Sequence, residues 1–498
     1  MSFVSNGFLI SVFFLVYLST FKINCYFVLP FETIFIKDKT VTDTDYFTNL
    51  TQSELSVNFN IGSKKEEIKL VLKMDKYGFL IYENTYDYNN SETYETFTPD
   101  FEDNMKTNWV PSSQEIPSKD NLYLPMYDSK ENKYNLKKTN KTIFLRIKQK
   151  VNTSIYFNEM FYEYGIIGLK LNNNPSFNAP EFVKSLKASD DIDSYTFYLT
   201  FDKNYKNGFA TNNNKGNFYI GKELTEQEDK INYIECTNFG GELAWSLTFD
   251  NIYLENKENK LIEFENRKRA NIIASYPYIK ATSEFYEYIN KNFFDDLLDK
   301  NICHKISFTR HEIYIDHHFY SYACDSQSEY FMDYLDKNFP DLIFEHKDLK
   351  EKFILTKKDL FAFNTNNDSD KNLYFLILSG EDYLDWILGI PFLKNYVLSY
   401  NYDTKKIGYY EHFGKEEPNK KDRDNPSFFK SITFKIIIVI ILIIVIFCLG
   451  MFFQKNYKKS RKKKANELDD DFEYESHKDK IDNNVNNKNE NESLGINE

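Results

Sequence analysis

The chain has 498 residues and a formal net charge of −13, with 42% hydrophobic and 28% charged residues. This length allows two or three domains, and the hydrophobic content is sufficient for a sizeable buried core. The negative charge argues against nucleic acid as a partner. Aromatic residues make up 17% of the chain, which favours strands over helices.

An apolar segment, GFLISVFFLVYLST, occupies residues 7–20. Its length and position are typical of the apolar part of a secretory signal peptide, so residues 1–25 are predicted to be one. An uncleaved anchor is the alternative, because no basic residue precedes the segment.

Short runs of aromatic and β-branched residues then follow one another closely, and they predict a mainly β fold with few short helices. The expected strands are residues 55–61, 69–74, 79–83, 142–147, 153–157, 165–171, 195–201, 216–221, 246–254, 312–315, 341–345, 353–356, 373–378 and 397–402. Two segments, 180–188 and 282–300, have apolar residues at helical spacing. The polar stretch 85–135 is predicted to be a long surface loop.

Residues 436–453, IIIVIILIIVIFCLGMFF, carry no charge. A helix of this length nearly spans a bilayer core of about 30 Å, so residues 434–453 are predicted to be a transmembrane helix after a linker at 413–433. Basic residues crowd just beyond it: Lys455, Lys458, Lys459, Arg461, Lys462, Lys463 and Lys464. They place the disordered tail, 454–498, in the cytosol, and the N-terminal bulk in the secretory lumen or outside the cell.

The cysteines suit an oxidising compartment. Cys25 and Cys448 fall near the signal peptide and in the span, which leaves Cys236, Cys303 and Cys324. Proximity in sequence favours a disulfide between Cys303 and Cys324, and the pairing of Cys236 stays open. Five asparagines head possible N-glycosylation sequons: Asn49, Asn89, Asn140, Asn152 and Asn367.

The stretch ILGIPFLKNYVLSYNYDTKKIGYY, residues 387–410, resembles the closing segment of pepsin-like aspartic proteases. Further motifs resemble that family in its order: NIGSKKEEIKLVLK (60–73), EYGIIGLKL (163–171), FVKSL (182–186), YTFYL (195–199), GNFYIG (216–221) and WSLTFDNIYL (245–254). The resemblance implies two β-rich lobes, 45–190 and 191–412, which are related by a pseudo-twofold axis. It also implies a peptide-binding cleft between the lobes.

That family uses two aspartates, each in Asp-Thr-Gly or Asp-Ser-Gly, which share one proton and activate a water. The sequence contains neither tripeptide. Family spacing places Lys73 and Ala274 at the two catalytic positions. Asp75 is the nearest replacement in the first half, but it requires a two-residue insertion. No aspartate lies between Asp250 and Asp295. A buried Lys73 is expected to find an acidic partner or to lose its proton.

Four histidines, His304, His311, His317 and His318, lie near two of the cysteines. The spacing is not His-Glu-x-x-His, and alternation along one strand would put His311 and His317 on one side and His318 on the other. We therefore predict polar strand faces rather than a metal site, and no cofactor.

The first hypothesis is a single-pass, membrane-anchored, catalytically inactive pepsin-like protein that binds a peptide or protein partner in the cleft. A divergent but active aspartic endopeptidase is the alternative, and a surface adhesion or structural ectodomain is the third option. The sequence does not fix the ligand or the oligomeric state.

Overall fold

The computed structural model describes residues 26–35, 53–96, 115–128, 133–147, 164–171, 181–222, 231–239, 241–256, 259–265, 268–312, 315–364, 370–380 and 385–410. All of them belong to one structural unit, Met1–Gly414; the other unit is Lys415–Glu498. The segments predicted as signal peptide, transmembrane helix and cytosolic tail lie outside the described residues. Among the residues described, no helix is long and apolar enough to cross a membrane.

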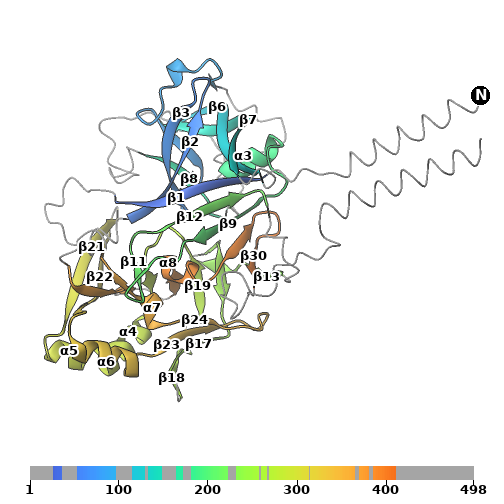
Figure 1. Ribbon diagram of the computed structural model, residues 1–498. Helices are drawn as coiled ribbons and strands as arrows, with labels where there is room; N and C mark the ends of the chain where they lie inside the picture. The colour runs from blue at the N-terminus through green and yellow to red at the C-terminus, as the bar shows by residue number, and fades with distance from the viewer. Residues whose placement is uncertain are drawn as a thin grey trace, which may run out of the picture. The chain divides into compact units, whose positions relative to one another are not determined.

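Most strands belong to two large sheets (Figure 1). The 13-stranded sheet has the order β13 (Ile231–Glu235), β30 (Lys406–Tyr410), β29 (Leu398–Asn401), β9 (Thr196–Phe201), β12 (Lys215–Ile220), β1 (Phe27–Phe35), β2 (Ser53–Ile61), β3 (Glu66–Lys73), β8 (Gly165–Gly168), β4 (Phe79–Tyr82), β7 (Lys133–Ile147), β6 (Glu115–Asp128) and β5 (Glu95–Thr96). Strand β1 pairs with β2 on one side and with β12 on the other, so it joins early and late parts of the chain.

The 11-stranded sheet has the order β10 (Tyr205–Lys206), β11 (Phe209–Thr211), β25 (Phe361–Phe363), β26 (Asn372–Phe375), β22 (Ile315–Asp325), β27 (Ile377–Gly380), β20 (Ile279–Lys280), β28 (Trp386–Leu388), β19 (Arg269–Ile272) and β16 (Ser246–Thr248), with β21 (Cys303–Glu312) paired to β22. Smaller sheets are β18 (Lys260–Glu263), β17 (Asn251–Glu255), β23 (Asp341–Glu345) and β24 (Phe353–Leu355), and the pair β14 (Asn238–Phe239) and β15 (Glu242–Leu243).

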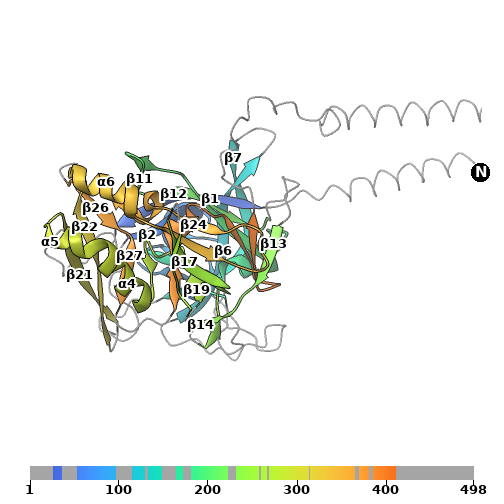
Figure 2. The ribbon, with the colours of Figure 1, turned by 90° about the horizontal axis from the view of Figure 1, so that it is seen from below.

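The helices are short: η1 (Tyr88–Asn90), α3 (Phe182–Ala188), α4 (Ser283–Ile289), η3 (Asn290–Phe294), α5 (Asp295–Asp299), α6 (Glu329–Asn338), α7 (Lys357–Leu360) and α8 (Ile390–Leu393). The Thr282 side chain accepts a hydrogen bond from the Phe285 amide and so caps the start of α4. Helices α4, α5 and α6 lie together beside β21 and β22 in both views (Figures 1 and 2).

Strand alternation explains how the main sheet covers its core. In β2, Leu55, Val57 and Phe59 are buried and belong to the main hydrophobic cluster, while Asn58 is exposed between them. The same cluster includes Trp245 and Trp386, so one continuous core runs from the first strands of the fold to the last.

The mainly β prediction is confirmed, and the helices expected at 180–188 and 282–300 are present. Four local predictions were wrong. The stretch 85–135 is not one loop, because β6 occupies Glu115–Asp128 within it, and residues 312–315 are not one strand, because β21 ends at Glu312 and β22 begins at Ile315. Residues 246–254 are not one strand but belong to β16 and β17, and residues 373–378 are divided between β26 and β27. The strand predicted at 153–157 lies outside the described residues. Strand β1 was missed: Pro30 and Glu32 interrupt its apolar run, and the strand pairs with two segments that are distant in the sequence, β2 and β12.

Candidate functional site

Two three-strand units in the fold have the same construction. In the first unit, β8 pairs in parallel with β3 and antiparallel with β4. In the second unit, β28 pairs in parallel with β19 and antiparallel with β20. Each central strand is a short buried run that ends at a glycine, Gly168 or Gly389, within the motifs GIIG and WILG.

Both glycines are required by close backbone approach. A Cβ at Gly168 would lie 2.5 Å from the carbonyl carbon of Tyr77 and 2.6 Å from the oxygen of Gly78. A Cβ at Gly389 would lie 2.1 Å from the oxygen of Tyr278 and 2.2 Å from that of Tyr276. In each unit, therefore, the backbone of one loop passes directly over the glycine, and no side chain fits between them.

These loops are residues 74–78, which we call the first loop, and residues 274–278, the second loop. The first runs from Lys73, which pairs with Gly168, to Phe79. In the second unit, Ile272 pairs with Leu388, the residue before Gly389. The next residue, Ile273, is therefore the equivalent of Lys73, and the second loop begins after it. In the strand after the first loop, Phe79 opposes Ile167, the residue before Gly168. In the strand after the second loop, Lys280 opposes Ile387, so Ile279 lies at the position of Leu388, the residue before Gly389. The two loops therefore have the same length.

This register corrects the position predicted in the second half by one residue. Lys73 corresponds to Ile273 rather than to Ala274, and Ala274 corresponds to Met74. The physical reason is that ladder pairing fixes where the strand ends, whereas counting along the sequence does not. Neither Ile273 nor Ala274 carries a carboxylate.

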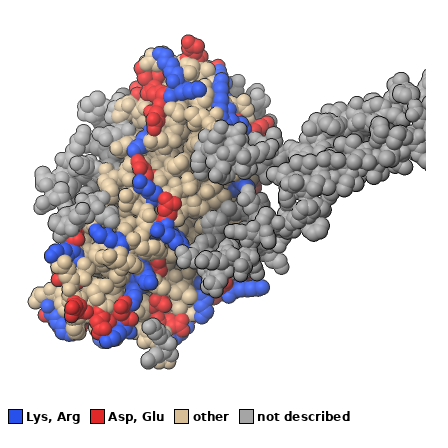
Figure 3. Space-filling model, in the orientation of Figure 1, with Lys and Arg blue, Asp and Glu red and all other residues tan. Residues whose placement is uncertain are grey.

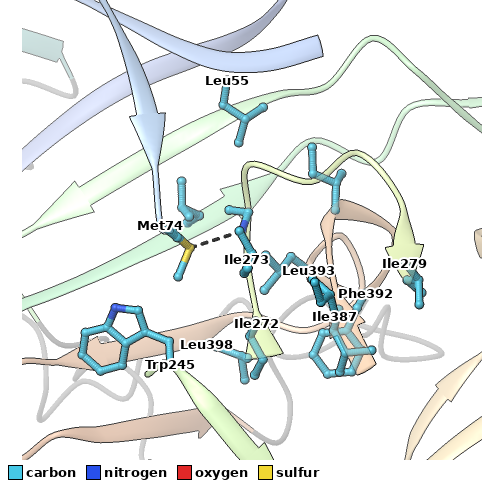
Figure 4. Close-up of a cluster of buried hydrophobic side chains, with 14 of the residues drawn as sticks. Leu55, Met74, Trp245, Ile272, Ile273, Ile279, Ile387, Phe392, Leu393 and Leu398 are labelled. Carbon is cyan, nitrogen blue, oxygen red and sulfur yellow. Dashed lines mark hydrogen bonds between the residues drawn. The ribbon is translucent and has the colours of Figure 1, made fainter. Parts of the chain in front are cut away.

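The first and second loops touch each other at equivalent residues (Figure 4). The Met74 Sδ atom accepts a hydrogen bond from the Ala274 amide at 3.3 Å. One position further on, the Ser275 hydroxyl donates to Asp75 Oδ1 at 3.3 Å. Both contacts therefore join residues at equivalent positions of the two loops.

Lys73 is buried, with 5% of its surface exposed, and its ammonium donates to Glu54 at the start of β2. The expectation that a buried Lys73 finds an acidic partner is confirmed. Sequence reasoning did not identify Glu54 as the partner of Lys73. The pairing of β2 with β3 would have identified it. Ile61 opposes Glu66 across the turn at 62–65, and counting outward from that pair brings Glu54 opposite Lys73.

Asp75 is the one carboxylate within residues 73–78 and 273–278. It is partly exposed and accepts the Ser275 hydroxyl. A shared-proton pair requires a second carboxylate within hydrogen-bond distance, and neither loop supplies one. Besides the Asp75 carboxylate, the two loops carry the thioether of Met74, the hydroxyl of Ser275, the amine of Lys76 and the phenols of Tyr77, Tyr276 and Tyr278.

Further contacts tie the two units together next to the loops. The buried indole of Trp245 donates to the backbone oxygen of Leu169 at 2.7 Å. The Tyr77 hydroxyl donates to Glu242 at 3.1 Å, and Lys170 pairs with the same carboxylate at 2.8 Å. The hydrogen bond from Lys170 lowers the pKa of Glu242, while burial raises the pKa of Tyr77.

The predicted disulfide between Cys303 and Cys324 is present, and it joins directly opposed residues of β21 and β22. Cys236 is a free thiol, and burial raises its pKa to about 12, so it is a weak nucleophile at neutral pH.

Two predicted sequon asparagines, Asn89 and Asn140, are described and exposed. The Asn140 side-chain amide donates to the Ser189 oxygen at 2.6 Å, and Thr142 of its sequon is fully buried. Asn49, Asn152 and Asn367 lie outside the described residues.

The histidine expectation was partly wrong, because alternation along one strand does not apply. His304 and His311 lie in β21, whereas His317 and His318 lie in β22, where His317 opposes Arg310. Within the residues that the structure describes, no group of three or more His, Cys, Asp or Glu is arranged to hold a metal ion.

No family model matches the chain, and no curated protein sequence matches it.

Proposed function

We propose that this protein is a catalytically inactive, pepsin-like, membrane-anchored protein whose two lobes, 45–190 and 191–412, bind a peptide or protein partner. The observation that carries the proposal is the pair of matching units whose loops meet at equivalent residues. This is the arrangement that the resemblance to pepsin-like proteases implies for their two catalytic loops. Ligand binding is then proposed for the region between the lobes.

The proposed inactivity rests on the side chains of the two loops. At the first catalytic position Lys73 forms a buried pair with Glu54, and at the second Ile273 is buried at 3% exposure. General acid–base assistance contributes typically about 10²–10⁴ in rate, and both carboxylates that would supply it are replaced. A positive charge also stands where the family holds a shared proton.

Proteolysis is tested by incubating the purified chain with a random peptide library from pH 3 to pH 7 and reading cleavage by mass spectrometry. We expect no pepstatin-sensitive cleavage, either from the native chain or from Lys73→Asp, because the second loop supplies no partner carboxylate. The alternative function, a divergent aspartic endopeptidase, is favoured by the position of Asp75 between the loops. Cleavage that disappears in Asp75→Ala would establish that alternative.

Peptide binding requires its own measurement. A photo-crosslinking amino acid at Tyr77, which is half-buried in the first loop, is expected to capture peptides from the same library. The matched control replaces Tyr330, which is exposed on α6, and should capture few. Equal capture at the two positions would contradict binding at the loops and favour the adhesion or structural alternative.

The membrane anchor is a separate part of the proposal and rests on residues 434–453 and the basic cluster that follows them. External protease applied to intact cells is expected to degrade the N-terminal bulk and to spare residues 454–498. Loss of a C-terminal epitope under the same treatment would contradict this orientation.

A further inference from the structure

A second concave surface lies on the 13-stranded sheet, independent of the proposed function. It is an open groove of about 450 Å³ across the consecutive strands β9, β12, β1 and β2. Its apolar part is the Pro30 ring together with the backbone at Phe31 and Gly216, because the Phe31 side chain is buried in the core on the other side of the strand. Its polar side chains are Glu32, Ser56, Asn58, Asp202, Lys215 and Asn217. The volume falls within the range of about 300–1,000 Å³ that is usual for small-molecule sites.

Cross-strand pairing places these polar side chains on one face. Glu32 opposes Lys215 on one side and Ser56 on the other, and Pro30 opposes Asn217. Opposed residues of antiparallel strands point to the same side of the sheet, so the groups converge on the groove. The set is therefore a feature of the register of the sheet rather than a chance grouping of loop side chains.

The groove is separate from the two loops. Leu55 in β2 lies in the buried cluster that also contains Met74 of the first loop (Figure 4). Ser56 and Asn58 alternate with Leu55 and so project from the opposite side of β2. A ligand in the groove therefore binds on the side of β2 opposite to Leu55 and to the contact between Met74 and the second loop.

Apart from Ser56, whose buried hydroxyl donates to the backbone oxygen of Glu32, the polar groups in the groove are available to a ligand. The side chains of Asp202, Lys215 and Asn217 form no hydrogen bond or ion pair within the described part of the chain. Asn58 donates to Glu67 at 3.0 Å, and Glu32 has one long contact, 3.5 Å, with Lys69. Both contacts are exposed, so a ligand can replace them at little cost.

The chemistry of the groove excludes two other kinds of ligand. Glu32 of β1 pairs with Lys215 of β12 and with Ser56 of β2, so the middle of the groove has no free backbone edge to which a strand of peptide could be added. Acidic and basic side chains alternate across the middle of this face, over the region of β1 and β12, which does not favour a strongly charged ligand (Figure 3). What the groove offers is a mixture of donors and acceptors around the small apolar surface of Pro30 and Gly216.

We propose that the groove binds a neutral saccharide of one or two rings. Sugar hydroxyls both donate and accept hydrogen bonds, so they match carboxylates, amides and an ammonium at once. The apolar face of a sugar ring matches the flat surface at Pro30 and Gly216.

Binding is measured on the full chain in detergent by saturation-transfer NMR with lactose, maltose and cellobiose, followed by titration of the best probe. We expect transfer to at least one disaccharide. Asp202→Ala and Asn217→Ala should each weaken its binding about tenfold, because each removes a hydrogen-bonding group from the ligand. Asp299→Ala, another exposed aspartate outside the groove, serves as the matched control and should leave binding unchanged.

A melting curve for each variant separates loss of binding from loss of folding, and both groove positions lie on the accessible surface. No transfer to any of the three sugars up to about 10 mM, or binding that the two groove variants do not weaken, would overturn the proposal. Binding of a zwitterionic dipeptide at the same residues, in place of the sugars, would also overturn it and assign the groove to peptide ends.

Discussion

The first loop is preceded by a buried ion pair, whereas the second loop is preceded by a buried isoleucine. Lys73 ends β3, which pairs in parallel with β8, and Ile273 directly follows β19, which pairs in parallel with β28. Both side chains are nearly inaccessible to solvent. The two halves thus share the same backbone arrangement but differ in the side chain that precedes the loop. The comparison teaches that close backbone packing requires the glycines, and that the framework tolerates either an apolar side chain or a charge that has its own partner.

The largest loss of stability should come from breaking the ion pair between Lys73 and Glu54. Glu54→Ala leaves the buried Lys73 ammonium without its carboxylate, and we expect a loss of about 3–5 kcal/mol in the free energy of unfolding. Lys73→Met, and the double variant Glu54→Ala/Lys73→Met, should lose much less, because no uncompensated charge remains. Urea unfolding followed by tryptophan fluorescence measures all three.

The apolar counterpart provides the control for that series. Ile273→Val removes one methylene from a buried site and should cost about 0.5–1.5 kcal/mol. A Glu54→Ala variant as stable as Ile273→Val would show that Lys73 finds another partner, and the contrast between the two halves would fail.

The glycines test what the two halves share. Gly168→Ala and Gly389→Ala each force a Cβ onto loop backbone, and we expect losses of about 2–3 kcal/mol in both. Gly208→Ala has open space around it but a φ of +82°, so it should lose only about 1 kcal/mol through backbone strain. A large difference between Gly168→Ala and Gly389→Ala would break the equivalence of the two units.

The two buried tryptophans sharpen the comparison further. Trp245→Phe removes the hydrogen bond to Leu169 that ties the halves together, and should cost about 1–2 kcal/mol beyond the change in packing. Trp386→Phe is the matched control, because the Trp386 indole nitrogen has no hydrogen-bond partner within the described structure. Equal losses in thermal stability would show that packing alone accounts for both side chains.

The smallest effect concerns a partly exposed charge cluster in the second half. Burial alone would raise the pKa of Glu345, but hydrogen bonds from Lys352, Asn251 and Tyr253 outweigh it and lower the pKa to about 2. Because the folded pKa is depressed, the stabilisation is complete above about pH 4.5 and is lost as the pH falls towards 2.

Exposure of the Glu345 side chain limits this contribution to about 1 kcal/mol. The melting temperature of Glu345→Gln should therefore approach that of the native chain as the pH is lowered from 5 to 2. If the melting temperatures of the two proteins kept a constant difference from pH 5 to pH 2, the lowered pKa of Glu345 would be contradicted.

The sequence by itself determined the local structure wherever alternation or helical spacing was strong, as in β2, β9 and β12 and in the helices near 182–188 and 283–299. It also located the glycine motifs at 165–168 and 386–389, because only glycine permits such a close backbone approach. It failed at β1, whose strand conformation depends on two distant partners, and at residues 312–315, which were predicted to be one strand although β21 ends at Glu312 and β22 begins at Ile315.

Only the tertiary structure decided the content of the candidate site. Ladder register replaced Ala274 by Ile273, and strand pairing selected Glu54 as the partner of Lys73. The contacts of Met74 with Ala274 and of Asp75 with Ser275 join residues 200 positions apart. Local sequence encodes which backbone conformation a segment prefers, but the pairing of distant segments depends on the free energy of burying all of them together, which no short stretch contains.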